Sequence, residues 1–135
     1  MDLPSFSPPV ITLTYASVLG LVFLLMSINV VRHRARAKVD IGYGEDKDLG
    51  GVFRAHANFA EYVPLILVIL ALTEGAGGDD LLLRILGGGL VVARLLHVWG
   101  LSSSTGVTPG RFIGTILTWA VLLVASGMGL YIALG

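Results

Sequence analysis

The sequence contains no cysteine and few charged residues. None of its 135 residues is cysteine, and Asp, Glu, Lys and Arg together make up 13%. The missing cysteine excludes disulfides and a protein thiol as the nucleophile, and it leaves the redox compartment undetermined. The formal net charge is zero, which gives no reason to expect a nucleic-acid partner. No metal site is predicted.

The few charges stand between long apolar runs. Hydrophobic residues make up 55% of the chain, against about 45–50% in soluble domains, where about 25% of residues are charged. From Val10 to Val31 no residue is charged, and a run of about 22 residues exceeds the about 20 that a transmembrane helix needs. Because the charges follow this run rather than precede it, we expect a retained helix and not a cleaved secretory signal.

Four such segments predict an all-α integral membrane four-helix bundle, formed by a single domain over residues 1–135. The expected helices cover about residues 10–32, 51–74, 80–100 and 110–134. A basic cluster, Arg32 to Lys38, follows the first of them, and Lys and Arg are enriched in cytoplasmic loops. We therefore expect the first loop in the cytoplasm and both termini outside. In a bacterium this topology corresponds to the inner membrane.

A polar stripe lies near the start of the second segment. At about 100° per helical residue, Arg54, Asn58 and Glu61 fall within a narrow sector of one face, and His56 points the other way. Lipid cannot satisfy these polar groups. The three side chains of the stripe must therefore face protein, water or a ligand.

The third and fourth segments bring further polar groups to the same end of the bundle. Arg94 and His97 lie in the cytoplasmic half of the third segment, and Arg111 begins the fourth. Arg84 is the exception, an interface residue on the external side. The polar groups therefore converge under an otherwise apolar bundle, which is where we expect the functional site.

The second segment resembles helix two of the MAPEG family, the membrane-associated proteins in eicosanoid and glutathione metabolism. The resemblance rests on the run Arg54-Ala55-His56-Ala57-Asn58-Phe59-Ala60-Glu61 and on the Tyr62-Val63-Pro64-Leu65 that follows it. Four helices, a basic first loop and the chain length extend it over the whole chain. It implies a homotrimer, with glutathione as the cofactor bound between neighbouring subunits near the cytoplasmic side.

Carried over by position, the resemblance also implies roles for single residues. Those implied to bind glutathione are Arg34, Arg54, Asn58, Glu61, Arg94 and His97. Arg111 resembles the family arginine that activates the thiol, and a guanidinium there would lower a thiol pKa of about 8.5 by about one to two units. One turn after His97 the glutathione-using synthases have a tyrosine, whereas this chain has Leu101.

The chemistry of glutathione suits these residue types. It carries two carboxylates, one ammonium group and one thiol; arginine forks bind carboxylates through paired hydrogen bonds. Glu61 would hold the ammonium group, and Asn58 offers both a donor and an acceptor. Of the arginines in the first loop, Arg34 is our choice over Arg32 and Arg36 as the one that meets the glutathione carboxylates or the thiol.

Some of these residues also have structural interpretations. Arg54 and Glu61 would form an ion pair with each other. His97 would pack or hydrogen-bond between helices, and Thr115 and Thr118 would bond back to carbonyls of their own helix.

Two functions from different classes fit the sequence. The first is a glutathione-dependent membrane enzyme, a transferase or peroxidase that activates the thiol to attack lipophilic electrophiles. The alternative is a non-catalytic lipid-binding or scaffolding membrane protein of the same fold, which Leu101 keeps open. A transporter is disfavoured because no polar residues continue through the external half. The expected partners are two further copies in a homotrimer, membrane lipids and a lipophilic small-molecule substrate, with no nucleic acid.

Overall fold

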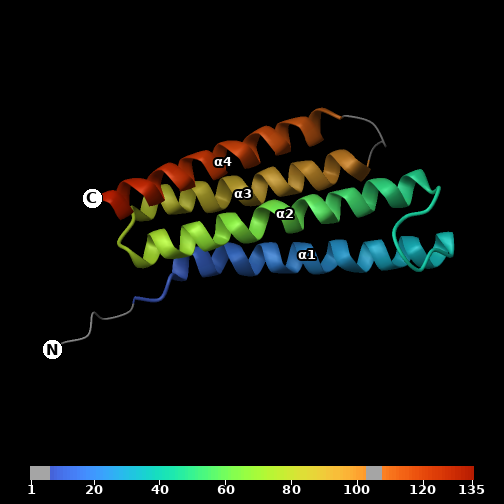
Figure 1. Ribbon diagram of the computed structural model, residues 1–135, viewed down its shortest axis with the longest axis horizontal. Helices are drawn as coiled ribbons and strands as arrows, with labels where there is room; N and C mark the ends of the chain where they lie inside the picture. The colour runs from blue at the N-terminus through green and yellow to red at the C-terminus, as the bar shows by residue number, and fades with distance from the viewer. Residues whose placement is uncertain (1–6, 103–107) are drawn as a thin grey trace.

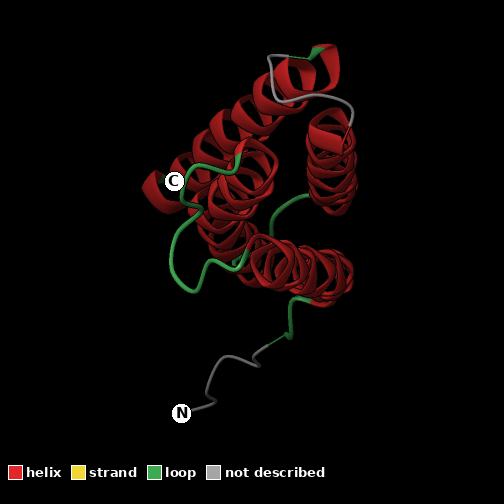
Figure 2. Ribbon diagram, turned by 90° about the vertical axis from the view of Figure 1, so that its right-hand side faces the viewer, coloured by secondary structure: helices red, strands yellow, loops and turns green. Residues whose placement is uncertain are grey.

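The computed structural model describes residues 7–102 and 108–135, and in this part of the chain all regular structure is helical (Figures 1 and 2). The helices are α1 (Val10–Ala37), α2 (Lys47–Gly75), α3 (Asp80–Ser102) and α4 (Pro109–Leu134). Each contains a span long and apolar enough to cross a membrane. The predicted all-α, four-helix membrane architecture is confirmed.

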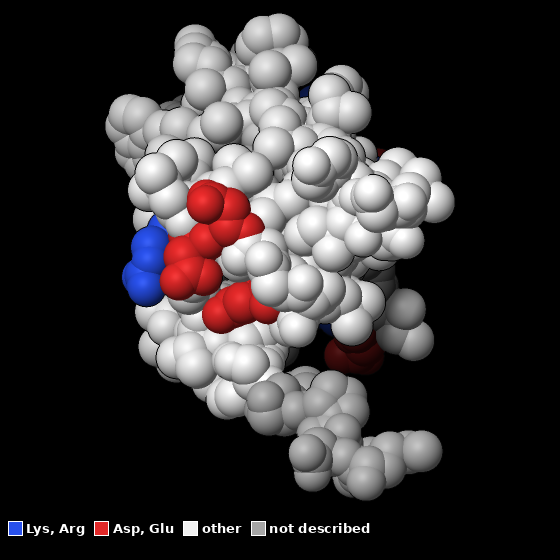
Figure 3. All heavy atoms as spheres, turned by 90° about the vertical axis from the view of Figure 1, so that its left-hand side faces the viewer, with Lys and Arg blue, Asp and Glu red and all other residues white. Residues whose placement is uncertain are grey.

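The helices run alternately in opposite directions, so the bundle has two different ends (Figure 1). The loop end carries the α1–α2 loop and the start of α4, and the turn end carries the α2–α3 turn. Every Lys and Arg except Arg84 lies toward the loop end. The charged side chains at the turn end (Figure 3) come from Glu74, Asp79, Asp80 and Arg84. Within the described residues, α1 packs on α2 and α3 but not on α4.

Large apolar side chains cover the outside of the bundle as well as its core. The most deeply buried include Leu19, Leu49, Ile66, Leu70, Leu83 and Leu90. The most exposed include Leu25, Leu72, Leu123 and Leu134. A soluble monomer rarely exposes an apolar surface of this extent, so the outer surface is that of an integral membrane protein.

The helices at the loop end are longer than expected. α1 continues through the basic cluster to Ala37, past the expected end near residue 32, because Arg and Ala are good helix formers outside the membrane as well. Lys38 follows Ala37 as the C-cap residue, with a left-handed φ of 56°. α2 begins at Lys47 rather than near residue 51, because the Asp46 side chain accepts a hydrogen bond from the Leu49 amide and caps the helix.

Glycines allow α3 and α4 to touch backbone to backbone near the loop end. A Cβ at Gly114 would lie 2.6 Å from the Ala93 carbonyl oxygen and 2.9 Å from the His97 backbone nitrogen. A Cβ at Gly100 would lie 2.6 Å from the Arg111 backbone nitrogen. Small residues at a helix contact are the usual means of close packing in membranes. Here they position the polar residues of both helices.

The start of α1 is capped by a side chain from another helix. Its N-cap residue, Pro9, makes no side-chain cap hydrogen bond. Instead, the carboxylate of Glu74, at the end of α2, accepts hydrogen bonds from the Ile11 and Thr12 amides, both at 2.8 Å. It satisfies two amides that the helix itself leaves unpaired and complements the positive end of the helix dipole.

We expect Glu74→Gln to destabilise the bundle by about 1 kcal/mol, because the amide keeps one acceptor oxygen and loses the charge. Thermal unfolding in detergent measures the loss. Glu45→Gln is the matched control, since Glu45 is an exposed loop residue. Equal unfolding temperatures for the two variants would contradict the capping role.

Candidate functional site

A groove of about 320 Å³ opens near the loop end between α2, α3 and α4. Its lining residues are Arg54 and Asn58 of α2, His97 of α3, and Arg111, Phe112, Thr115, Ile116 and Trp119 of α4. The alternating helix directions place these side chains at a similar depth. Four of the seven predicted site residues, one of them Arg111, therefore meet in this groove.

Glu61 lies beside the groove through an ion pair with Arg54. The Arg54 Nη1 is 3.0 Å from the Glu61 Oε1, seven residues further along α2. This confirms the predicted pair. The two side chains are 58% and 52% exposed, so both charges lie on the outside of the single chain.

Arg94 lies behind the groove rather than in it. Its side chain is fully buried, its Nη1 donates to the Asn58 Oδ1 at 2.8 Å, and its guanidinium carbon lies 5.4 Å from the centre of the Phe59 ring. The Nε and Nη2 atoms have no hydrogen-bond partner among the described residues. Because the Asn58 oxygen accepts the hydrogen bond from Arg94, the Asn58 NH₂ group faces the groove as a donor. Arg94 therefore orients Asn58.

His97 is buried at the α3–α4 contact. Its Nδ1 lies 3.4 Å from the Thr115 Oγ1, and Thr115 donates its own proton to the Arg111 carbonyl oxygen at 2.9 Å. The imidazole nitrogen is therefore the donor of the pair. Thr118 is buried and donates to the Gly114 carbonyl oxygen. Both threonines bond back to their own helix, which confirms their structural interpretation.

An apolar wall borders the polar part of the groove. Phe112, Ile116 and Trp119 follow one face of α4 at spacings of four and three residues, and all three are exposed. The Trp119 Nε1 donates to the Tyr62 hydroxyl at 3.1 Å, which holds the indole against α2. These residues were not predicted as part of the site. Their spacing places them on one face of the helix, starting one residue after Arg111, and this pattern was the signal in the sequence that could have identified them.

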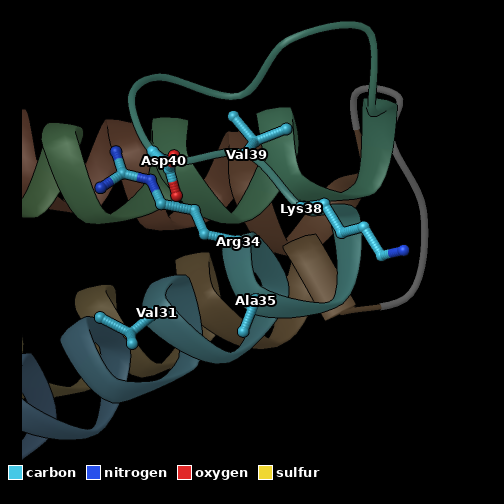
Figure 4. A pocket seen from close by; sticks show the side chains of 6 residues that line it. All are labelled: Val31, Arg34, Ala35, Lys38, Val39 and Asp40. Carbon is cyan, nitrogen blue, oxygen red and sulfur yellow. The ribbon is translucent and has the colours of Figure 1, made fainter.

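Arg34 lies apart from the groove in this chain. Its Nε donates to the Gly42 carbonyl oxygen at 3.0 Å, and its guanidinium lies 5.3 Å from the centre of the Phe53 ring. The Arg34 side chain turns toward the α1–α2 loop, whereas the Lys38 side chain points away from Arg34 (Figure 4). The separate cavity that it borders, about 600 Å³, is lined by Val31, Arg34, Ala35, Lys38, Val39 and Asp40.

A third cavity, of about 470 Å³, lies under the α1–α2 loop and shares Arg54 with the groove. Its other lining residues include Tyr43, Glu45, Lys47 and Phe53. Arg54 therefore has open space both toward α4 and toward the loop.

His56 points away from the groove, as predicted. Its Nε2 lies 2.9 Å from the Ser27 Oγ, and its ring stacks on Phe23 at 4.5 Å between centroids. Since Ser27 donates to the Phe23 carbonyl oxygen, the imidazole nitrogen donates to Ser27. This contact joins α1 to α2. The side chain of Leu101, the position at which the resemblance to the glutathione-using synthases implies a tyrosine, lies outside the described residues.

The groove thus combines two guanidinium groups, an amide and an imidazole with a carboxylate at its edge and an exposed apolar wall. Among the described residues, no group of three or more His, Asp or Glu side chains is arranged to hold a metal ion. The arrangement suits a ligand that carries both anionic and cationic groups together with an apolar part.

The sequence matches the MAPEG family over residues 12–131. The chain belongs to the MAPEG family. Two similar proteins are the inner membrane protein YecN of Escherichia coli K12 and the protein of the same name from Escherichia coli O6:H1. Each is 31% identical over 110 residues, which cover 82% of this chain and 82% of the relative. Together with the four candidate spans, these matches identify a multi-pass integral membrane MAPEG protein.

Proposed function

We propose that this MAPEG protein is a glutathione-dependent membrane enzyme, a transferase or peroxidase acting on lipophilic electrophiles. The observation that carries the proposal is the groove in which Arg54, Asn58 and Arg111 converge beside an apolar wall. The carboxylates and the thiol of glutathione need cationic and hydrogen-bonding partners, and the electrophile needs an apolar surface.

The Arg54–Glu61 pair supports the binding of a ligand that carries both charges. Both side chains are more than half exposed, so each has a free edge beside the groove. A ligand carboxylate would bind the Arg54 fork, and the ligand ammonium would bind Glu61. The Asn58 NH₂ group, which Arg94 turns toward the groove, would donate to a second acceptor of the ligand.

The position of Arg111 in the groove supports the chemical step. A guanidinium near the glutathione sulfur favours the thiolate, which is the nucleophilic form. In the transferase reaction the thiol proton leaves to water, the sulfur forms a bond to the electrophilic carbon, and the leaving group departs with the bonding electron pair. The exposed wall of Phe112, Ile116 and Trp119 supports entry of an apolar electrophile from the lipid.

We propose that the protein works as a homotrimer. Arg54 and Glu61 are exposed on a membrane-spanning helix, where lipid cannot satisfy charged groups. A neighbouring copy would cover them and would bring its own Arg34 to the groove. Light scattering of the detergent-solubilised protein measures the mass of the complex, and a monomer would contradict the proposal.

The basic residues at the loop end support an orientation with that end in the cytoplasm and both termini outside. In a bacterium this places the protein in the inner membrane. Because the chain has no cysteine, single Lys38→Cys and Gly77→Cys variants report the orientation directly. In intact cells an impermeant maleimide should label Gly77→Cys alone, and the reverse pattern would refute this orientation.

Isothermal titration of glutathione into the purified protein tests the binding site. We expect the wild type to bind and Glu61→Gln to bind about tenfold more weakly, because a charged hydrogen bond to the ammonium group is lost. Arg111→Ala should still bind but lose about 10- to 100-fold of the thiolate, measured by its ultraviolet absorbance at fixed pH.

Arg84→Ala, which removes a charge at the turn end, is the control and should match the wild type in both measurements. An absence of both glutathione binding and glutathione-dependent turnover would refute the proposal. Stabilisation by fatty acids or phospholipids with no response to glutathione would favour the non-catalytic lipid-binding or scaffolding alternative.

A further inference from the structure

α1 has an outer face that ends in two arginines. Val18, Leu21, Leu25 and Ile28 are 43%, 66%, 67% and 47% exposed. At 100° per residue they share a sector of about 80° with Arg32 and Arg36. The helix continues without interruption through both arginines, so the apolar row and the cationic pair form one strip, which we call the α1 strip.

The two arginines of the α1 strip have no counter-charge in the described chain. Both are exposed, and neither has a hydrogen-bond or ion-pair partner among the described residues. Arg34, on the other side of α1, differs because it bonds to Gly42 and lies over Phe53. Arg32 and Arg36 are one helical turn apart, so their forks can bind the same anion.

We propose that Arg32 and Arg36 bind the phosphate of an anionic phospholipid whose acyl chain lies along Ile28, Leu25 and Leu21. Phosphate oxygens match two arginine forks. The row from Arg32 to Leu21 is about 17 Å long at 1.5 Å per residue, close to the about 15 Å depth of one leaflet's hydrocarbon. In a lipid whose headgroup carries a cation, that cation neutralises the lipid's own phosphate, and the charge of the two guanidinium groups stays uncompensated. The strip therefore favours a lipid with a net negative charge.

Native mass spectrometry in neutral detergent tests the proposal, with phosphatidylglycerol and phosphatidylcholine as the probes. We expect the wild type to bind phosphatidylglycerol at least about tenfold more tightly than phosphatidylcholine. The double variant Arg32→Gln/Arg36→Gln should lose about tenfold or more of its phosphatidylglycerol affinity, with little change for phosphatidylcholine. If the double variant does not fold, Arg36→Gln alone should show a smaller loss in the same direction.

A charge-matched control is the double variant Lys38→Gln/Lys47→Gln, which removes two cations from the same end but not from the strip. It should keep the affinity of the wild type for phosphatidylglycerol. An equal loss in this control would overturn the proposal in favour of a general surface potential. Displacement of the lipid by inorganic phosphate at an equal concentration would overturn it in favour of a simple anion site.

Discussion

Asn58→Asp raises the stability of the protein and weakens its binding of glutathione. The new carboxylate keeps an oxygen for the Arg94 Nη1 and supplies a counter-charge to a fully buried cation, which we expect to add about 1–2 kcal/mol. The same change replaces the NH₂ donor that faces the groove by a negative oxygen. Glutathione binding should fall about 100-fold. Thermal unfolding and isothermal titration on one sample measure the two effects.

Asn58→Ala separates the two roles of this side chain. It removes the acceptor for Arg94 as well as the donor toward the groove, so both stability and glutathione binding should fall. If Asn58→Asp were less stable than the wild type, another group would already neutralise Arg94. If it bound glutathione normally, the Asn58 NH₂ group would not be a ligand contact.

Gly114→Ala separates α3 from α4 and costs about 1–3 kcal/mol of stability. The added Cβ meets backbone atoms, the Ala93 carbonyl oxygen at 2.6 Å and the His97 nitrogen at 2.9 Å, and neither can rotate away. Because His97 and Thr115 line the groove next to this contact, glutathione binding should weaken as well. Thermal unfolding and ligand titration measure both consequences.

Gly127→Ala is the matched control for this substitution. It makes the same change in the same helix, but the added Cβ would contact no atom within 4 Å apart from its own turn of helix. Alanine favours helix over glycine by about 1 kcal/mol, so this variant should be as stable as the wild type or slightly more so. Equal destabilisation of both variants would show that helix propensity, rather than the α3–α4 contact, determines the loss.

The location of the groove was predictable because it follows from topology. Three consecutive apolar runs after the first loop must alternate in direction, which brings residues early in α2, late in α3 and early in α4 to one end. Arg54, His97 and Arg111 occupy such positions and do meet in the groove. Their grouping required no knowledge of helix packing.

The detailed orientation of the arginines was not predictable from one sequence. Arg94 precedes His97 by three residues, about 60° away around the helix. α3 is apolar around most of its circumference, so its periodicity does not say which of these side chains faces the groove. The orientation of Arg34 depends on where α1 ends and on how the α1–α2 loop folds back, which brings the Gly42 carbonyl to the Arg34 side chain. Neither can be read from the extent of an apolar run.

The Glu74 cap has a consequence for the order in which the chain enters the membrane. Ile11 and Thr12 are buried in the finished bundle, so water does not replace the carboxylate that accepts their amide hydrogens. That carboxylate is made more than 60 residues later in synthesis. Until α2 has been made and inserted, the first turn of α1 lacks the carboxylate that caps it. The cap of the first helix is therefore completed only by the end of the second.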